Sequence, residues 1–90
     1  MIDTEITVIN KLGLHARATA KLVTLTSTFK SSIRVAKSGG RLVDAKNMMQ
    51  VMLLGAGKGI TLQICIEGED EAAALEAIQA LFARRFDEAE

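Results

Sequence analysis

The spacing of the apolar residues is the feature that most constrains this fold, because it changes along the chain between the repeat of a strand and the repeat of a helix. Residues 2–9 and residues 60–67 alternate between inward and outward positions, as in half-buried strands. Elsewhere apolar residues recur every three or four positions, which is the spacing of one helix face. The chain must therefore bury one face of a sheet under helices.

Two longer helices are predicted, one over residues 16–28 and one that begins after Asp70 as its N-cap. Their inward stripes are Ala18, Leu22, Leu25 and Phe29 in the first helix and Leu75, Ile78, Phe82 and Phe86 in the second. The first helix contains several threonines, which are mediocre helix formers. Its stability must therefore come mainly from the packing of its apolar stripe.

Two short strands and a short helix are predicted in the middle of the chain. One strand is marked by residues 33–35 and the other by residues 42–43, and a glycine-containing turn between them fits a tight hairpin. Residues 47–54 are expected to form a helix with either Asp44 or Asn47 as its cap.

The resulting order of elements is β-α-β-β-α-β-α. This order predicts an α+β fold, an open-faced β-sandwich in which a four-stranded, mainly antiparallel sheet carries three helices on one face. Residues 1–90 are expected to form a single domain, because chains of this size seldom divide into two stable cores. The acidic tail at residues 87–90 is expected to fray.

The composition argues against several classes of function. Eleven basic and eleven acidic residues cancel and only 3% of the residues are aromatic, so the electrostatic and stacking features of a nucleic-acid binder are missing. No apolar stretch approaches the roughly 20 residues of a membrane span, and the first residues do not resemble a secretion signal. A single cysteine, Cys65, fits a reducing compartment. We therefore expect a cytoplasmic protein.

His15 is the only histidine, and it lies where a loop containing Gly13 leads into the first helix. The first backbone N–H groups of a helix lack partners and the macrodipole is positive there, so the amides of Ala16 and Arg17 are expected to cradle an anion such as phosphate. The same field opposes the imidazolium form and favours a neutral, nucleophilic ring. The guanidinium of Arg17 adds a planar cation suited to phosphate oxygens.

On the residues alone, other roles for His15 stay open. A lone histidine near a helix start is more often a cap or a surface residue than a phosphoacceptor. No nearby Ser or Cys supports a hydrolytic triad, and one histidine with the distant Cys65 is weak support for a metal site. The glycine-rich residues 55–59 lack the spacing of a nucleotide-binding loop and precede a strand, which favours a turn. No metal and no cofactor is expected.

Three segments resemble, in the correct order, the histidine-containing phosphocarrier protein (HPr) family of the phosphoenolpyruvate-dependent phosphotransferase system. They are the active-site segment at residues 10–17, the second-helix segment at residues 45–52 and the loop at residues 56–59. The resemblance covers essentially the whole chain. The lead-in to the histidine and the closing residues 84–88 are most similar to the nitrogen-related branch, often called NPr.

The resemblance implies a stoichiometric phosphocarrier and not an enzyme in its own right. His15 would be phosphorylated on Nδ1 by an enzyme I-type protein charged from phosphoenolpyruvate, and would pass the group to an enzyme IIA-type acceptor. Arg17 would lie beside the phosphohistidine. In the nitrogen-related branch the relay would be regulatory, and the protein is expected to act as a monomer. The sequence does not identify the acceptor.

The family places an apolar, partner-binding patch on the second helix beside the active site. This makes Met48, Met49 and Met52 candidate contacts, since flexible thioethers adapt to more than one partner. At least one of the three is expected to fill the core instead. The docking surface is completed by first-helix residues: Ala16, Ala20 and Lys21.

Two positions depart from the family pattern. Ala18 stands where the family commonly has a proline, which removes no chemical group but can loosen the first helical turn. Asn47 stands where Gram-positive members carry a regulatory serine. Asn47 can cap the helix but cannot be phosphorylated, so kinase control is not expected here.

A β-α-β-β-α-β order also describes ferredoxin-like domains that bind a small molecule without transferring phosphate. This sensor or interaction domain is the alternative function. The two hypotheses differ at His15, which the carrier requires and the sensor does not.

Overall fold

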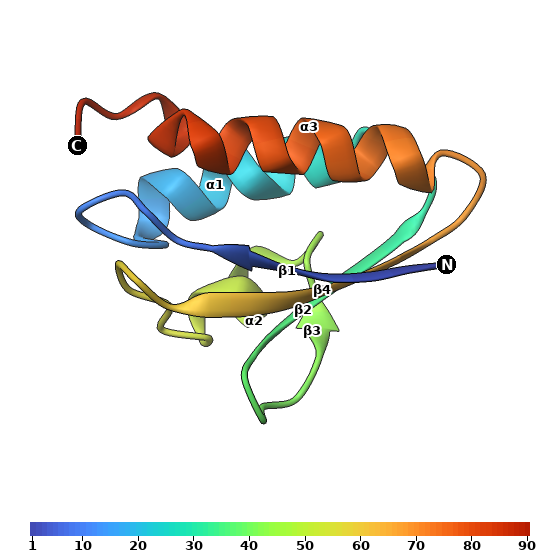
Figure 1. Cartoon of the computed structure of the whole chain (residues 1–90), viewed down its shortest axis with the longest axis horizontal. Coiled ribbons are helices and arrows are strands. Elements are labelled where there is room, and N and C mark those ends of the chain that lie inside the picture. The colour runs from blue at the N-terminus through green and yellow to red at the C-terminus, as the bar shows by residue number, and fades with distance from the viewer.

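The computed structural model describes residues 1–90 and contains one four-stranded sheet with helices packed against it (Figure 1). The strands are β1 (Ile2–Thr7), β2 (Ser32–Lys37), β3 (Val43–Asp44) and β4 (Thr61–Glu67). They lie in the order β1-β4-β2-β3, and every neighbouring pair is antiparallel. The helices are α1 (Ala16–Thr26), α2 (Met48–Met52) and α3 (Glu71–Ala83), followed by a short 3-10 turn, η1 (Arg85–Asp87). The predicted α+β fold is confirmed.

The sheet buries one face, as the alternating spacing predicts. In the central strand β4, Leu62, Ile64 and Ile66 are fully buried and belong to one apolar cluster with Leu22 of α1 and Ile78 of α3. Fully burying a side chain of this size stabilises a fold by about 1.5–3 kcal/mol. The cluster therefore holds the helices on the sheet.

The two longer helices lie side by side over the sheet in Figure 1. The shorter α2 packs against α1 and β3. Its N-cap is Asn47, whose side-chain oxygen accepts a hydrogen bond from the N–H of Gln50 at 3.1 Å. This decides between the two predicted caps, because the Asp44 carboxylate instead accepts from Lys46 N–H. No helix in this structure has the length and apolar character that a membrane crossing requires.

The end of α3 differs from the prediction. The helix stops at Ala83, although the apolar stripe suggested that it continues to Phe86. Arg85, Phe86 and Asp87 have φ of 56°, 54° and 65°, which is the left-handed region. The Phe86 ring is still buried, because the turn folds it back against Phe82 with 4.8 Å between ring centroids. The burial of the Phe86 ring, together with the hydrogen bond from Lys21 Nζ to the Phe86 carbonyl, offsets the local cost of this backbone.

The acidic tail does not fray, so this prediction was wrong. The Glu90 carbonyl accepts a hydrogen bond from Lys11 N–H, and the Glu88 carboxylate contacts His15. After the left-handed turn, the last residues continue past the end of α3 to the loop that precedes α1 (Figure 1). Tertiary contacts therefore order residues whose composition is typical of a solvated terminus.

Asp70 lies at the N-cap position of α3 but does not cap it with its side chain. Its carboxylate accepts hydrogen bonds from Lys30 N–H at 2.8 Å, from Ser31 N–H at 2.9 Å and from the Ser31 hydroxyl. The hydroxyl of Ser31, followed by the backbone N–H groups, holds the pKa of Asp70 below its ordinary value. Asp70 therefore does not cap α3 with its side chain. Its carboxylate links the start of α3 to the segment that connects α1 and β2.

The loop before α1 packs closely on the loop before β4. Leu14 N–H donates to the Ala56 carbonyl at 2.8 Å, and Gly13 has a φ of +67°. A Cβ at Gly13 would lie 2.6 Å from the Ala56 carbonyl oxygen and 2.7 Å from the Gly57 Cα. Only glycine fits here, so this contact fixes where α1 begins.

Substituting Gly13→Ala should test this contact, with Gly39→Ala as the matched control. Both glycines have positive φ, but a Cβ at Gly39 meets nothing within 4 Å. The control should lose about 1–2 kcal/mol of unfolding free energy from the left-handed backbone alone. Gly13→Ala should lose about 1–3 kcal/mol more from the clash. Urea denaturation of both variants measures the difference, and equal losses would contradict the close packing.

Acid titration should test the stabilising effect of the hydrogen bonds that the Asp70 carboxylate accepts. A carboxyl whose pKa is lowered in the folded state stabilises the fold above its unfolded value of about 3.9, and this stability is lost as the pH falls through the folded pKa. Asp70→Asn should therefore unfold more easily than the wild type at neutral pH, and the gap should narrow below pH of about 4. The pKa values of Asp87 and Glu88 are also lowered, but the wild type and Asp70→Asn both contain these two residues, so their effects cancel in the comparison. A gap that does not change with pH in thermal unfolding would contradict this role.

Candidate functional site

His15 is the N-cap residue of α1, with extended backbone at φ −71° and ψ 178°. Its carbonyl accepts the first helical hydrogen bond from Thr19 N–H at 2.8 Å, and the Thr19 hydroxyl donates to the Leu14 carbonyl at 3.0 Å. Leu14 itself is buried in the core. The loop, the helix start and the core thus position the imidazole together, at the end of the helix where the sequence predicts it.

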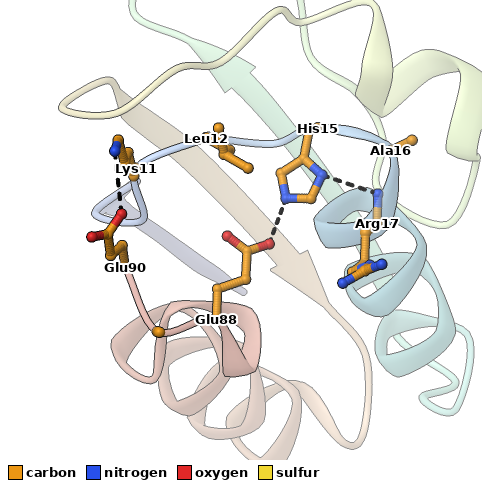
Figure 2. Close-up of a pocket in the computed structure, with 8 residues that line it drawn as sticks. Lys11, Leu12, His15, Ala16, Arg17, Glu88 and Glu90 are labelled. Carbon is orange, nitrogen blue, oxygen red and sulfur yellow. Dashed lines mark hydrogen bonds and ion pairs between the residues drawn. The ribbon is translucent and has the colours of Figure 1, made fainter.

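The two ring nitrogens of His15 have different partners on opposite edges of the ring (Figure 2). Nδ1 accepts a hydrogen bond from Arg17 N–H at 3.3 Å, whereas Nε2 contacts the carboxylate of Glu88. A carboxylate only accepts, so Nε2 carries the proton, and Nδ1 keeps its lone pair. We assign this tautomer from the hydrogen-bond partners. The side chain is 29% exposed, so the ring is neither buried nor free.

Glu88 is held by a second side chain. The Asn10 amide nitrogen donates to Glu88 Oε1 at 3.1 Å and to the Gly13 carbonyl at 2.8 Å. Asn10 is fully buried, and Glu88 is 17% exposed at its side chain. The hydrogen bond from His15 lowers the pKa of Glu88, and that from Asn10 adds to this effect against the opposing effect of desolvation. Glu88 is therefore an ionised acceptor against the ring.

An open pocket of approximately 790 Å³ lies between the loop before α1, the first turn of α1 and the C-terminal tail. Its lining includes Leu12, His15, Ala16, Arg17, Glu88 and Ala89 (Figure 2). The guanidinium of Arg17 makes no hydrogen bond or ion pair within the protein, and the residue is exposed. The pocket thus offers an unengaged planar cation beside the N-terminus of a helix.

Two lysines near the pocket are already engaged by the tail. Lys11 forms an exposed ion pair with Glu90 at 3.3 Å. Lys21 Nζ donates to the Phe86 carbonyl at 2.9 Å and lies 3.4 Å from the Asp87 carboxylate. The first-helix candidates thus differ: Ala16 is exposed at the pocket and Ala20 is half-buried, while the ammonium of Lys21 braces the turn that follows α3.

The methionines of α2 all face outward. Met48, Met49 and Met52 are 37%, 71% and 41% exposed, and only Val51 of this helix is buried. The prediction that at least one methionine fills the core is therefore wrong. A five-residue helix has room for one inward position, and Val51 takes it. Leu53, at 81% exposure, extends the same apolar surface.

Sequence reasoning missed Glu88 and Asn10 as parts of this site. The signal for Glu88 was weak, since an acidic residue third from the end of the sequence, in a loop-like tail, is usually solvated. Asn10 stands in the segment that leads to His15, but nothing in its identity shows that its amide donates to a residue near the other end of the chain. Neither contact follows from local spacing.

Comparisons with known proteins agree with this geometry. Residues 2–84 match the family described as the PTS HPr component phosphorylation site. The chain is 51% identical over 88 residues to the phosphocarrier protein HPr of Xylella fastidiosa, covering 98% of each. It is similar to the crystal structure of HPr-C-His from Thermoanaerobacter tengcongensis, with a TM-score of 0.94, 38% identity and coverage of 100% of both chains.

A structure described as an HPr dimer from Thermoanaerobacter tengcongensis is also similar, with a TM-score of 0.77 and 39% identity over 98% of this chain and 100% of that one. Some proteins of this fold therefore assemble as dimers. None of these comparisons favours the ferredoxin-like sensor.

Proposed function

The chain belongs to the HPr family of phosphocarrier proteins of the phosphotransferase system, and on that premise we propose that it carries the phosphoryl group on Nδ1 of His15. The observation that carries the proposal is the tautomer of the ring. The Nδ1 lone pair accepts only the long hydrogen bond from Arg17 N–H at the helix start, while Nε2 holds the proton. A ring in this state is a nucleophile at one atom only.

The start of α1 suits the product of that attack. A phosphoryl group on Nδ1 would lie where the amides of the first turn, those of Ala16 and Arg17, face outward. Arg17 N–H now donates to Nδ1 and would be free to donate to a phosphate oxygen once that lone pair is used. The Arg17 guanidinium is close enough in sequence and free enough of other contacts to neutralise part of the charge. Positioning and charge stabilisation are the main requirements of phosphoryl transfer.

Membership of this family implies an enzyme I donor and an enzyme II-type acceptor. We propose more narrowly that the acceptor is an enzyme IIA-type protein of the nitrogen-related branch, so that the relay is regulatory. The support is the segment that leads to His15 and the closing residues 84–88, which resemble that branch. We place the relay in the cytoplasm, and we expect residues 1–90 to act as one domain and as a monomer.

The exposed apolar surface of α2 supports the docking role expected for it. Met48, Met49 and Met52 are all available, and α2 packs against α1, which begins at the phosphoacceptor. Adaptable thioethers suit a carrier that must fit both a donor and an acceptor. Asn47, as the cap of α2, offers no hydroxyl for kinase control.

Incubation with enzyme I and phosphoenolpyruvate tests the assignment of His15. The wild type should gain one acid-labile phosphoryl group, and His15→Ala should gain none while keeping its fold by circular dichroism. Phosphorylated protein mixed with enzyme IIA of either the nitrogen or the sugar branch then tests the acceptor. Phosphorylation that persists in His15→Ala would refute the assignment, and transfer only to a sugar-branch acceptor would refute the nitrogen-related role.

Arg17→Ala tests the role of the free guanidinium. The rate of transfer from enzyme I should fall by roughly ten-fold or more, because a charge-stabilising group that faces the transferred phosphate is lost. The unfolding free energy should stay within about 0.5 kcal/mol of the wild type, since the side chain is exposed and unpaired. Arg41→Ala, an exposed arginine on the hairpin, is the matched control. Equal transfer rates in the two variants would remove Arg17 from the mechanism.

A further inference from the structure

The C-terminal tail brings a carboxylate to the edge of the His15 ring that is opposite to the phosphoacceptor nitrogen. The contact joins Nε2 of His15 to Oε2 of Glu88, two residues that lie 73 positions apart in the sequence (Figure 2). At the other edge, Nδ1 accepts only the 3.3 Å hydrogen bond from Arg17 N–H. We propose that Glu88 is a positioning residue for phosphoryl transfer, which holds the ring proton on Nε2 and so keeps the Nδ1 lone pair available. This inference rests on the proposed function of His15.

The carboxylate is built into place by several contacts. Phe86 is fully buried, and its carbonyl accepts from Lys21 Nζ at 2.9 Å, which fixes the turn just before Glu88. Asn10 then donates to the other carboxylate oxygen at 3.1 Å. Both oxygens of Glu88 thus have a donor, one from the loop before α1 and one from the ring.

The orientation of the Asn10 amide is determined by its surroundings. Its nitrogen faces two acceptors, the Gly13 carbonyl and Glu88, while its own oxygen is buried without a hydrogen-bond partner. The reversed amide would set an oxygen against both acceptors, which is worse. The Asn10 amide therefore donates to Oε1 of Glu88. This leaves Oε2 of the same carboxylate as the acceptor for the Nε2 proton of His15.

The transfer step explains what the charge of Glu88 would do. The Nδ1 lone pair forms the new N–P bond as the bond from phosphorus to the donor breaks, and the electron pair of that bond leaves with the donor. The proton stays on Nε2, so the ring becomes a phosphorylated imidazolium with one positive charge. Glu88 faces that charge at the Nε2 edge, as the carboxylate of a catalytic triad faces its imidazolium. Because the phosphorylated ring stays protonated on Nε2, it leaves as a neutral imidazole when the phosphoryl group is transferred onward to the acceptor.

Glu88→Gln is the sharpest test, because an amide can supply only one acceptor where two donors are present. With its oxygen toward Asn10, the amide NH₂ would face His15 and favour a proton on Nδ1. Glu90→Gln is the matched control, because it removes the same charge from the same tail without touching the ring. Glu88→Ala removes the acceptor without adding a donor.

The ¹⁵N chemical shifts of the ring report the tautomer in the unphosphorylated protein, at a pH where the ring is neutral. The wild type and Glu90→Gln should show the proton on Nε2, and Glu88→Gln should show a shift of the population toward Nδ1–H. The rate of phosphorylation by enzyme I should fall by roughly ten-fold in Glu88→Gln, less than for a fully buried triad carboxylate because this pair is partly exposed. The rate of phosphorylation of Glu88→Ala should lie between the rates of Glu88→Gln and of the Glu90→Gln control.

A tautomer or a rate in Glu88→Gln that matches Glu90→Gln would overturn the proposal. A faster rate in both Glu88 variants would overturn it as well and would make the tail a cover over the site. The shift measurement needs no phosphoryl donor. A wild type that accepts no phosphoryl group would therefore refute the proposed function, whereas an unchanged tautomer would refute the role of Glu88 alone.

Discussion

The position of His15 depends on the close contact between two loops, the one that precedes α1 and the one that precedes β4. Gly13 packs against the backbone of Ala56 and Gly57, and Leu14 N–H donates to the Ala56 carbonyl. Because Leu14 is also buried, the chain has no freedom to move the first turn of α1 along the sheet. The start of α1, and with it the backbone amides of the first turn and the backbone of His15, is therefore set by packing. A carrier needs this rigidity, since its partners supply the rest of the reacting groups.

The fold could be predicted from the sequence because its elements are specified locally. The alternation of residues 60–67 has one interpretation as a strand, and Leu62, Ile64 and Ile66 lie on the buried face that the alternation predicts. Cys65 is also buried, although the alternation puts it on the opposite face. The position of His15 at the start of α1 was predictable for the same reason. The fold and the phosphoacceptor candidate thus depend on patterns that span a few residues.

The parts that could not be predicted depend on contacts between distant segments. Phe86 belongs to the apolar stripe by its spacing, yet it reaches the core through a left-handed turn that no local propensity favours. Asp70 has the residue type of an N-cap, but Ser31 and the adjacent amides offer it more hydrogen bonds than the helix does. In both cases tertiary contacts outweigh a local preference. Glu88 escaped notice for the same reason, because its partners Asn10 and His15 lie near the other end of the chain.

The two edges of the imidazole have different roles: one is held by the chain itself, and the other carries the nitrogen that reacts with the partners. The Nε2 edge is closed by the chain itself, through Glu88 and the buried Asn10 behind it. At the Nδ1 edge, the only contact within the chain is a long hydrogen bond of 3.3 Å from Arg17 N–H. A bond of that length is easily exchanged for one to an oxygen of the phosphoryl group that we propose for Nδ1. An exchangeable contact on one edge and firm positioning on the other are compatible requirements, because a phosphocarrier must present the same atom to donor and acceptor without retaining what it carries.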